Sequence, residues 1–111
     1  MVSVRRQADA TIIDVHGDLD ILSSVDLTAA IATAADGSDP LVVASLEQCT
    51  FCDSSGLAAL AVAKKRLGIR LKVVVPKGGH VRHVFDITEL TEYLSLYGTV
   101  EEALAAYDSP R

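Results

Sequence analysis

The chain has little of what membrane, secreted or nucleic-acid-binding proteins need. None of its apolar runs approaches the ~18 residues that cross a bilayer. Its N-terminus turns polar after the first residues, whereas a signal peptide needs an apolar segment of about 7–15 residues. Ten Lys and Arg against fifteen Asp and Glu give a net charge of −5, which opposes a sequence-independent grip on nucleic acid or anionic lipid. We therefore expect a soluble, cytoplasmic protein whose partner is another protein.

Cysteine is also scarce, and its two copies leave three alternatives open. Cys49 and Cys52 form a C-x-x-C pair, which in a cytosolic α/β chain can be a thioredoxin-like redox site. No Trp or Pro flanks the pair. Zinc would need two more ligands, for which His80 and His83 are the candidates from a distant segment. Because cysteine is often a small buried hydrophobe, we expect a structural role here, with no metal and no cofactor.

The length fits one domain with one core. With 111 residues, half of them apolar, the chain can bury a core without a metal or disulfide. No repeat or linker interrupts it, so we expect a free-standing domain over residues 1–108 and a frayed tail over 109–111.

Alternating short elements predict an α/β domain. Five runs rich in β-branched or alternating apolar residues predict strands at 2–7, 10–17, 41–46, 69–75 and 93–96. Four segments with helical periodicity predict helices at 24–35, 57–67, 79–87 and from Thr99 to Tyr107. Ser23 or Ser24 is the expected cap of the first helix, and Thr99 with Glu102 forms a T-x-x-E capping box for the last.

Residues 51–57, F-C-D-S-S-G-L, join a predicted strand to a predicted helix and place two hydroxyls beside a carboxylate. The first N–H groups of a helix lack intrahelical partners and carry the positive end of its dipole, so the fold tolerates a phosphate added there. Either Asp53 or Ser54 caps the helix. A serine at such a place is more often a plain cap than a regulatory site.

Three motifs together resemble the STAS-domain anti-sigma factor antagonists: G-D-L-D at 17–20, T-F-C-D-S-S-G-L at 50–57 and V-R-H-V-F-D-I-T at 81–88. The resemblance covers essentially the whole chain, and D-S-S-G-L between strand and helix is its most specific part. It implies a single STAS domain with a mixed sheet of about five strands flanked by four helices. Two positions depart from the family pattern: Ser45, where members often carry Asp, and Glu89, where glycine is common.

The resemblance implies a phosphorylation switch in bacterial transcription control. In that family the unmodified antagonist binds an anti-sigma factor, often a serine kinase, and frees a sigma factor; phosphorylation releases it, and a PP2C-type phosphatase resets it. The serine after the motif aspartate is the modified one, which corresponds to Ser54. The implied partner-binding residues are Asp20, Asp53, Ser54, Ser55, Gly56 and Leu57, with Asp18 a weaker candidate.

Two other functions compete with this hypothesis. The chain could be an adaptor or scaffold STAS domain of a signalling or lipid-transport complex, in which Ser54 is never phosphorylated. A hydrolase would use Ser54 or Ser55 as a nucleophile, but the sequence has no G-x-S-x-G motif and places no histidine beside either serine. We therefore expect a binding protein and not an enzyme.

Overall fold

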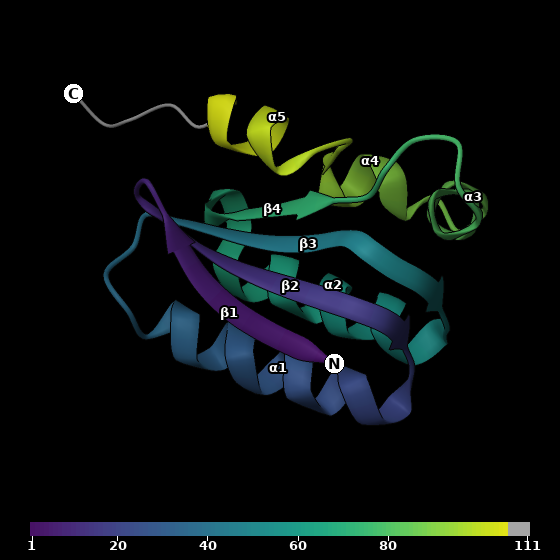
Figure 1. The fold of residues 1–111 in the computed structure, drawn as a ribbon, viewed down its shortest axis with the longest axis horizontal. Coiled ribbons are helices and arrows are strands. Elements are labelled where there is room, and N and C mark those ends of the chain that lie inside the picture. Colours follow the sequence, from purple (N-terminus) through teal and green to yellow (C-terminus); the bar gives the residue numbers. More distant parts are fainter. Residues whose placement is uncertain (107–111) are drawn as a thin grey trace.

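The computed structural model describes residues 1–106, which form a five-stranded mixed sheet with helices on both faces (Figure 1). The strands are β1 (Val2–Gln7), β2 (Ala10–Leu19), β3 (Leu41–Cys52), β4 (Leu71–Val74) and β5 (Leu96–Tyr97). The helices are α1 (Ile21–Ala35), α2 (Ser54–Leu67), α3 (His80–Ile87), α4 (Leu90–Leu94) and α5 (Val100–Ala105). Strand order follows the sequence, with β1 antiparallel to β2 and every other pair parallel. The mixed α/β fold is confirmed.

The sheet has apolar side chains on both faces because both are covered. Successive residues of β2 point to opposite sides: Ile13 joins the larger core cluster with α1 and α2, and Ile12 joins a smaller one against α5. The first six residues of β3 are all buried, as expected of a strand covered on both faces. None of the helices within residues 1–106 is long and apolar enough to cross a membrane.

Both long helices begin earlier than predicted. α1 starts at Ile21 with Asp20 as its cap, so the predicted start at 24 and the predicted cap at Ser23 or Ser24 are wrong. Asp20 Oδ1 accepts from the Ser23 N–H at 3.0 Å, and Ser23 Oγ accepts from the Asp20 N–H at 2.8 Å. α2 starts at Ser54 with Asp53 as its cap, which corrects the predicted start at 57 and decides between the two possible caps.

The strands also differ from prediction at their ends. β2 and β3 run on to Leu19 and Cys52, past the predicted ends at 17 and 46, because their last residues pair with each other. The C-x-x-C pair therefore lies in a strand. β4 begins only at Leu71, since residues 68–70 form a 3₁₀ turn in place of the predicted strand start.

A short helix replaces most of the last predicted strand. Residues 93–96 were predicted as strand, but α4 occupies Leu90–Leu94 and only Leu96–Tyr97 pair with β4. The described chain therefore has five α-helices and not the predicted four. The additional helix, α4, is bounded by two residues with left-handed backbone, Glu89 at φ 62° and Ser95 at φ 56°. Glu89 thus holds a bend that glycine adopts without strain.

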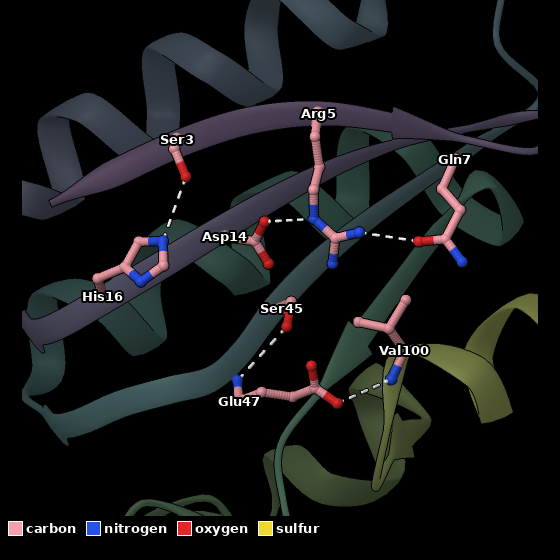
Figure 2. A network of polar contacts seen from close by, with 8 residues as sticks. All are labelled: Ser3, Arg5, Gln7, Asp14, His16, Ser45, Glu47 and Val100. Atoms are coloured by element: carbon pink, nitrogen blue, oxygen red, sulfur yellow. Dashed lines mark hydrogen bonds and ion pairs between the residues drawn. The ribbon is translucent and has the colours of Figure 1, made fainter.

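The start of α5 is fixed to β3. Thr99 Oγ1 accepts from the Glu102 N–H at 3.1 Å as predicted, but Glu102 Oε1 accepts from the Gly98 N–H at 2.9 Å, one residue before the cap. Glu47 of β3 accepts from the Val100 N–H at 3.1 Å (Figure 2). The predicted end of this helix at Tyr107 and the predicted tail at 109–111 lie outside the described residues.

The end of α1 is held by an arginine from much later in the chain. Arg70 donates to the carbonyl oxygens of Ala35 at 3.2 Å, Ala34 at 3.5 Å and Asp39 at 2.9 Å. The last carbonyls of a helix have no intrahelical partner. Arg70 therefore supplies donors to the Ala35 and Asp39 carbonyls and adds a further one to the Ala34 carbonyl, which also accepts from the Gly37 N–H at 3.1 Å.

Candidate partner-binding site

The loops that leave β2 and β3 lie side by side at one edge of the sheet. Parallel strands bring their carboxyl ends to the same edge, and here Leu19 pairs with Cys52. The Asp53 N–H donates to the Leu19 carbonyl at 3.1 Å, and Thr50 Oγ1 donates to Asp18 Oδ1 at 3.3 Å. The G-D-L-D and D-S-S-G-L segments are therefore neighbours, and the N-termini of α1 and α2 share one end of the molecule (Figure 1).

Asp53 caps α2, so the Ser54 side chain does not serve as the cap. Asp53 Oδ1 accepts from the N–H groups of Ser55 at 2.9 Å and Gly56 at 3.4 Å. Ser54 is the first helical residue and is exposed. Within residues 1–106, the structure shows no hydrogen bond to the Ser54 hydroxyl, so it is available to a modifying enzyme.

Gly56 lets α2 come close to β2 and β3. A Cβ at this position would lie 2.6 Å from Leu19 Cγ and 2.9 Å from Cys52 Sγ, distances that real Cβ atoms do not show. Leu57, the next residue, is only 9% exposed and belongs to the core. Gly56 and Leu57 therefore position Ser54 in this structure, and their direct contact with a partner stays a prediction.

The two aspartates of the first loop differ in what they contact. Asp20 forms the α1 cap, and the hydrogen bonds from Ser23 hold the pKa of its carboxyl below the usual range. Asp18 is exposed; its carboxylate accepts from Thr50, and its backbone carbonyl accepts from the Ser23 hydroxyl at 2.8 Å. Both lie at the edge that carries Ser54, so contact with a partner there remains a prediction for each.

Sequence reasoning missed an exposed apolar surface beside Ser54. Ile21 is 68% exposed, Leu22 79% and Val25 64% in the first turns of α1, and Val62 on α2 is 65% exposed. Contiguous exposed apolar residues mark interaction sites more often than isolated ones do. The available signal was Val25, an apolar residue outside the buried stripe of the predicted helix.

The cysteines have the environment of structural thiols. Both are free in the structure, and Cys52 is buried. Burial, with smaller contributions from Cys49 and Asp53, raises the pKa of the Cys52 thiol to about 12. Burial likewise raises the pKa of Cys49. A redox site needs an accessible thiolate, so these pKa directions oppose the thioredoxin-like alternative.

The histidine segment does approach the cysteine segment, through a ring stack. The rings of Phe51 and His80 lie 6.5 Å apart with an angle of 16° between their planes. Residues 1–106 contain no group of three or more His, Cys, Asp or Glu side chains that could hold a metal ion. The structure thus brings the two segments together without assembling four zinc ligands from the described residues.

Comparison with known proteins gives consistent likenesses. A family model for the STAS domain matches residues 1–103. An anti-sigma factor antagonist from Mycobacterium paratuberculosis has a TM-score of 0.85 at 28% identity, over 96% of this chain and 92% of that one. The anti-sigma factor antagonist SpoIIAA in its unphosphorylated form gives 0.75 at 25% identity, over 94% and 93%. A STAS domain protein from Planctomyces limnophilus gives 0.77 at 25%, over 95% of each. No curated protein sequence matches the chain.

The close approach at Gly56 predicts that bulk there is costly. Gly56→Val should lower the free energy of unfolding by about 1–3 kcal/mol, because the added carbons overlap Leu19 and Cys52. Ala58→Val adds bulk to an exposed position of the same helix and should cost only ~0.5 kcal/mol. Urea unfolding of both variants measures the difference. Equal losses would contradict the steric role of Gly56.

The raised pKa of Cys52 predicts a loss of stability in alkali. In the folded chain the thiol stays protonated up to about pH 12, whereas in the unfolded chain it ionises near 9.0. The unfolded state therefore binds fewer protons between these values, and the free energy of unfolding falls as the pH rises, by at most ~1.4 kcal/mol per pH unit. Urea unfolding between about pH 8 and about pH 11 should give a shallower pH slope for Cys52→Ala than for wild type. Parallel slopes would mean that the folded thiol ionises normally.

Proposed function

The chain belongs to the STAS domain family, and on that premise we propose that it is an anti-sigma factor antagonist gated by phosphorylation of Ser54. The unmodified protein binds an anti-sigma factor of the serine-kinase type and frees a sigma factor in the bacterial cytoplasm. The kinase modifies Ser54 and is released, and a PP2C-type phosphatase restores the unmodified form. The protein acts by binding and not by catalysis. Its likeness over nearly the full length to two anti-sigma factor antagonists supports this proposal.

The observation that carries the proposal is the free hydroxyl of Ser54. If Ser54 were a plain cap, its oxygen would accept from the first N–H groups of α2. Asp53 accepts from those groups instead. Ser54 is left exposed at the first helical position, where helix capping does not require a hydroxyl. An exposed serine hydroxyl that the helix does not use is accessible to a kinase.

The position of the phosphate decides how the switch works. A phosphoserine carries about −1.5 to −2 charges, which would take the net charge from −5 to between about −6.5 and −7. At the N-terminus of α2 the helix dipole favours that charge, so the folded state loses little. Within an interface the same group loses its water and meets any opposed acidic residue, at a cost of several kcal/mol. The switch therefore acts on binding and not on folding.

Ser54 is predicted to be the residue that is labelled. Incubation with the serine-kinase anti-sigma factors of the source organism and ATP should phosphorylate wild type and Ser55→Ala, but not Ser54→Ala. Ser55→Ala is the matched control because it removes the neighbouring hydroxyl and leaves Asp53 as the cap. Equal labelling of Ser54→Ala would move the site elsewhere. A wild type that no kinase labels would favour the adaptor function.

A negative charge at Ser54 is predicted to weaken binding without unfolding the protein. Ser54→Asp should bind the anti-sigma factor at least tenfold more weakly, ~1.4 kcal/mol, while its free energy of unfolding changes by about 1 kcal/mol at most. Ser54→Asn introduces a side chain of nearly the same shape as Asp but without the charge, and its affinity should stay close to that of wild type. Calorimetric titration and a thermal melt of the same samples measure both quantities. Wild-type affinity for Ser54→Asp, or a loss explained by unfolding, would refute the charge mechanism.

A further inference from the structure

A groove runs between α1 and α2, starting beside the candidate site. Its volume is about 400 Å³. α1 contributes Ser24, Val25 and Thr28 to its lining, and α2 contributes Ser55, Ala58 and Val62. A smaller hollow of about 50 Å³ continues it past Thr28 and Val62 as far as Arg66. From Ser55 to Arg66 the α2 wall is about 16 Å long at ~1.5 Å per residue, which corresponds to about three helical turns.

The groove contains a buried hydroxyl that lacks a partner. Ser24 is only 7% exposed, and its Oγ is the one buried side-chain oxygen or nitrogen within residues 1–106 for which the structure shows no hydrogen bond. Buried polar groups are nearly always paired, and an exception needs an explanation. Ser24 is also one of the residues that line the groove, so its unpaired hydroxyl lies beside any group that occupies it. This hydroxyl distinguishes the groove from a plain apolar surface.

The wall of the groove on α2 leads directly to Ser54. Ser54, Ala58 and Val62 are spaced four residues apart and therefore follow one face of the helix. All three are exposed. The hydroxyl proposed as the phosphorylation site is thus the N-terminal end of the same stripe that forms the groove. On the opposite wall, Val25 follows Ile21 at the same spacing, which extends the apolar surface to the first turn of α1.

We propose that the anti-sigma factor lays an apolar helix face, about three turns long, into the α1–α2 groove, with one polar group that bonds to Ser24. The inference rests on the proposed function and adds the surface and the kind of segment that it takes. Small-molecule sites enclose most of their ligand, whereas Val25 and Val62 at the rims here are about two-thirds exposed. An open groove between two helices suits the apolar face of a third helix. Continuity with Ser54 assigns that helix to the partner that the phosphate releases.

This arrangement explains release without refolding. A phosphate on Ser54 would stand at the end of an apolar contact, where it must lose water with no cation in the groove lining to pair with at that end. The partner helix would then leave, while α1 and α2 keep their positions. One modification at the end of the stripe therefore affects the whole groove.

Charged substitutions in the groove test the proposal. Val25→Glu and Val62→Glu should each weaken calorimetric binding of a purified serine-kinase anti-sigma factor by thirtyfold or more, about 2 kcal/mol. Ile69→Glu is the matched control: Ile69 is apolar, 88% exposed and outside the groove, and this variant should bind within threefold of wild type. All three residues are exposed, so each variant should melt close to wild type. Val62→Ala, which adds no charge, should weaken binding about fivefold.

Ser24→Ala provides an independent test, because it should affect the melting temperature and the binding affinity differently. Removal of an unpaired buried hydroxyl should leave the melting temperature unchanged or raise it, while loss of the bond to the partner should weaken binding three- to tenfold. A merely structural hydroxyl would change the melting temperature alone, and that result would remove Ser24 from the interface.

Each alternative outcome overturns the proposal in a distinguishable way. If both Glu variants bind like wild type while Ser54→Asp still loses affinity, the groove is not the docking site and the proposed function stands. If wild type sediments as a dimer that Val62→Glu dissociates, a second copy occupies the groove instead. If wild type binds none of the anti-sigma factors tested, the proposed function fails and the groove assignment fails with it.

Discussion

The contact of α2 with β2 and β3 at Gly56 is the constraint on which the edge that carries Ser54 depends. With no side chain at this residue, the first turn of α2 lies directly against Leu19 and Cys52. That approach lets the Asp53 N–H reach the Leu19 carbonyl, which joins the two loops. Asp20, the cap of α1, follows Leu19 immediately. The missing Cβ therefore lets the first turn of α2, which carries Ser54, pack against the paired ends of β2 and β3.

The same edge combines two helix N-termini, each already provided with a carboxylate. Asp20 caps α1 and Asp53 caps α2, so both helices are complete before any partner or phosphate arrives. The surface between them can then be apolar without destabilising the helix ends. Ser54 does not serve as a cap, and for this reason a change in charge at its side chain can leave the helix ends intact.

Much of this could be predicted from the sequence, and the failures have identifiable causes. The D-S-S-G turn and the first four strands were recognisable from local chemistry and from periodicity, whereas most of the strand predicted at 93–96 lies in helix α4 or in the bend after it. The start of α1 was placed too late because Ile21 and Leu22 are apolar yet exposed, so they do not fit a buried stripe. The end of β3 was missed because polar residues interrupt its apolar run, although pairing with β2 continues to Cys52.

Other features arise only when the elements pack together. Helix α4 is five residues long, which is too short for a periodic signal. The left-handed bend before it is formed by Glu89 and not by a glycine, so the sequence gives no sign of it. The groove depends on the spacing of α1 and α2, which no local pattern contains. The missing hydrogen bond of Ser24 and the raised pKa of Cys52 are likewise consequences of burial, and burial is decided by neighbours from elsewhere in the chain.

The contact of Arg70 with the end of α1 has a consequence for the order of synthesis. The helix and the loop to Asp39 emerge from the ribosome about 30 residues before the guanidinium that binds their carbonyls. Until then the Ala35 and Asp39 carbonyls lack the guanidinium as a donor, while the Ala34 carbonyl can still accept from the Gly37 N–H. A nascent chain that ends before residue 70 therefore has the Asp20 cap at the start of α1 but not the arginine at its end, so the two ends of this helix gain their side-chain contacts at different stages of synthesis.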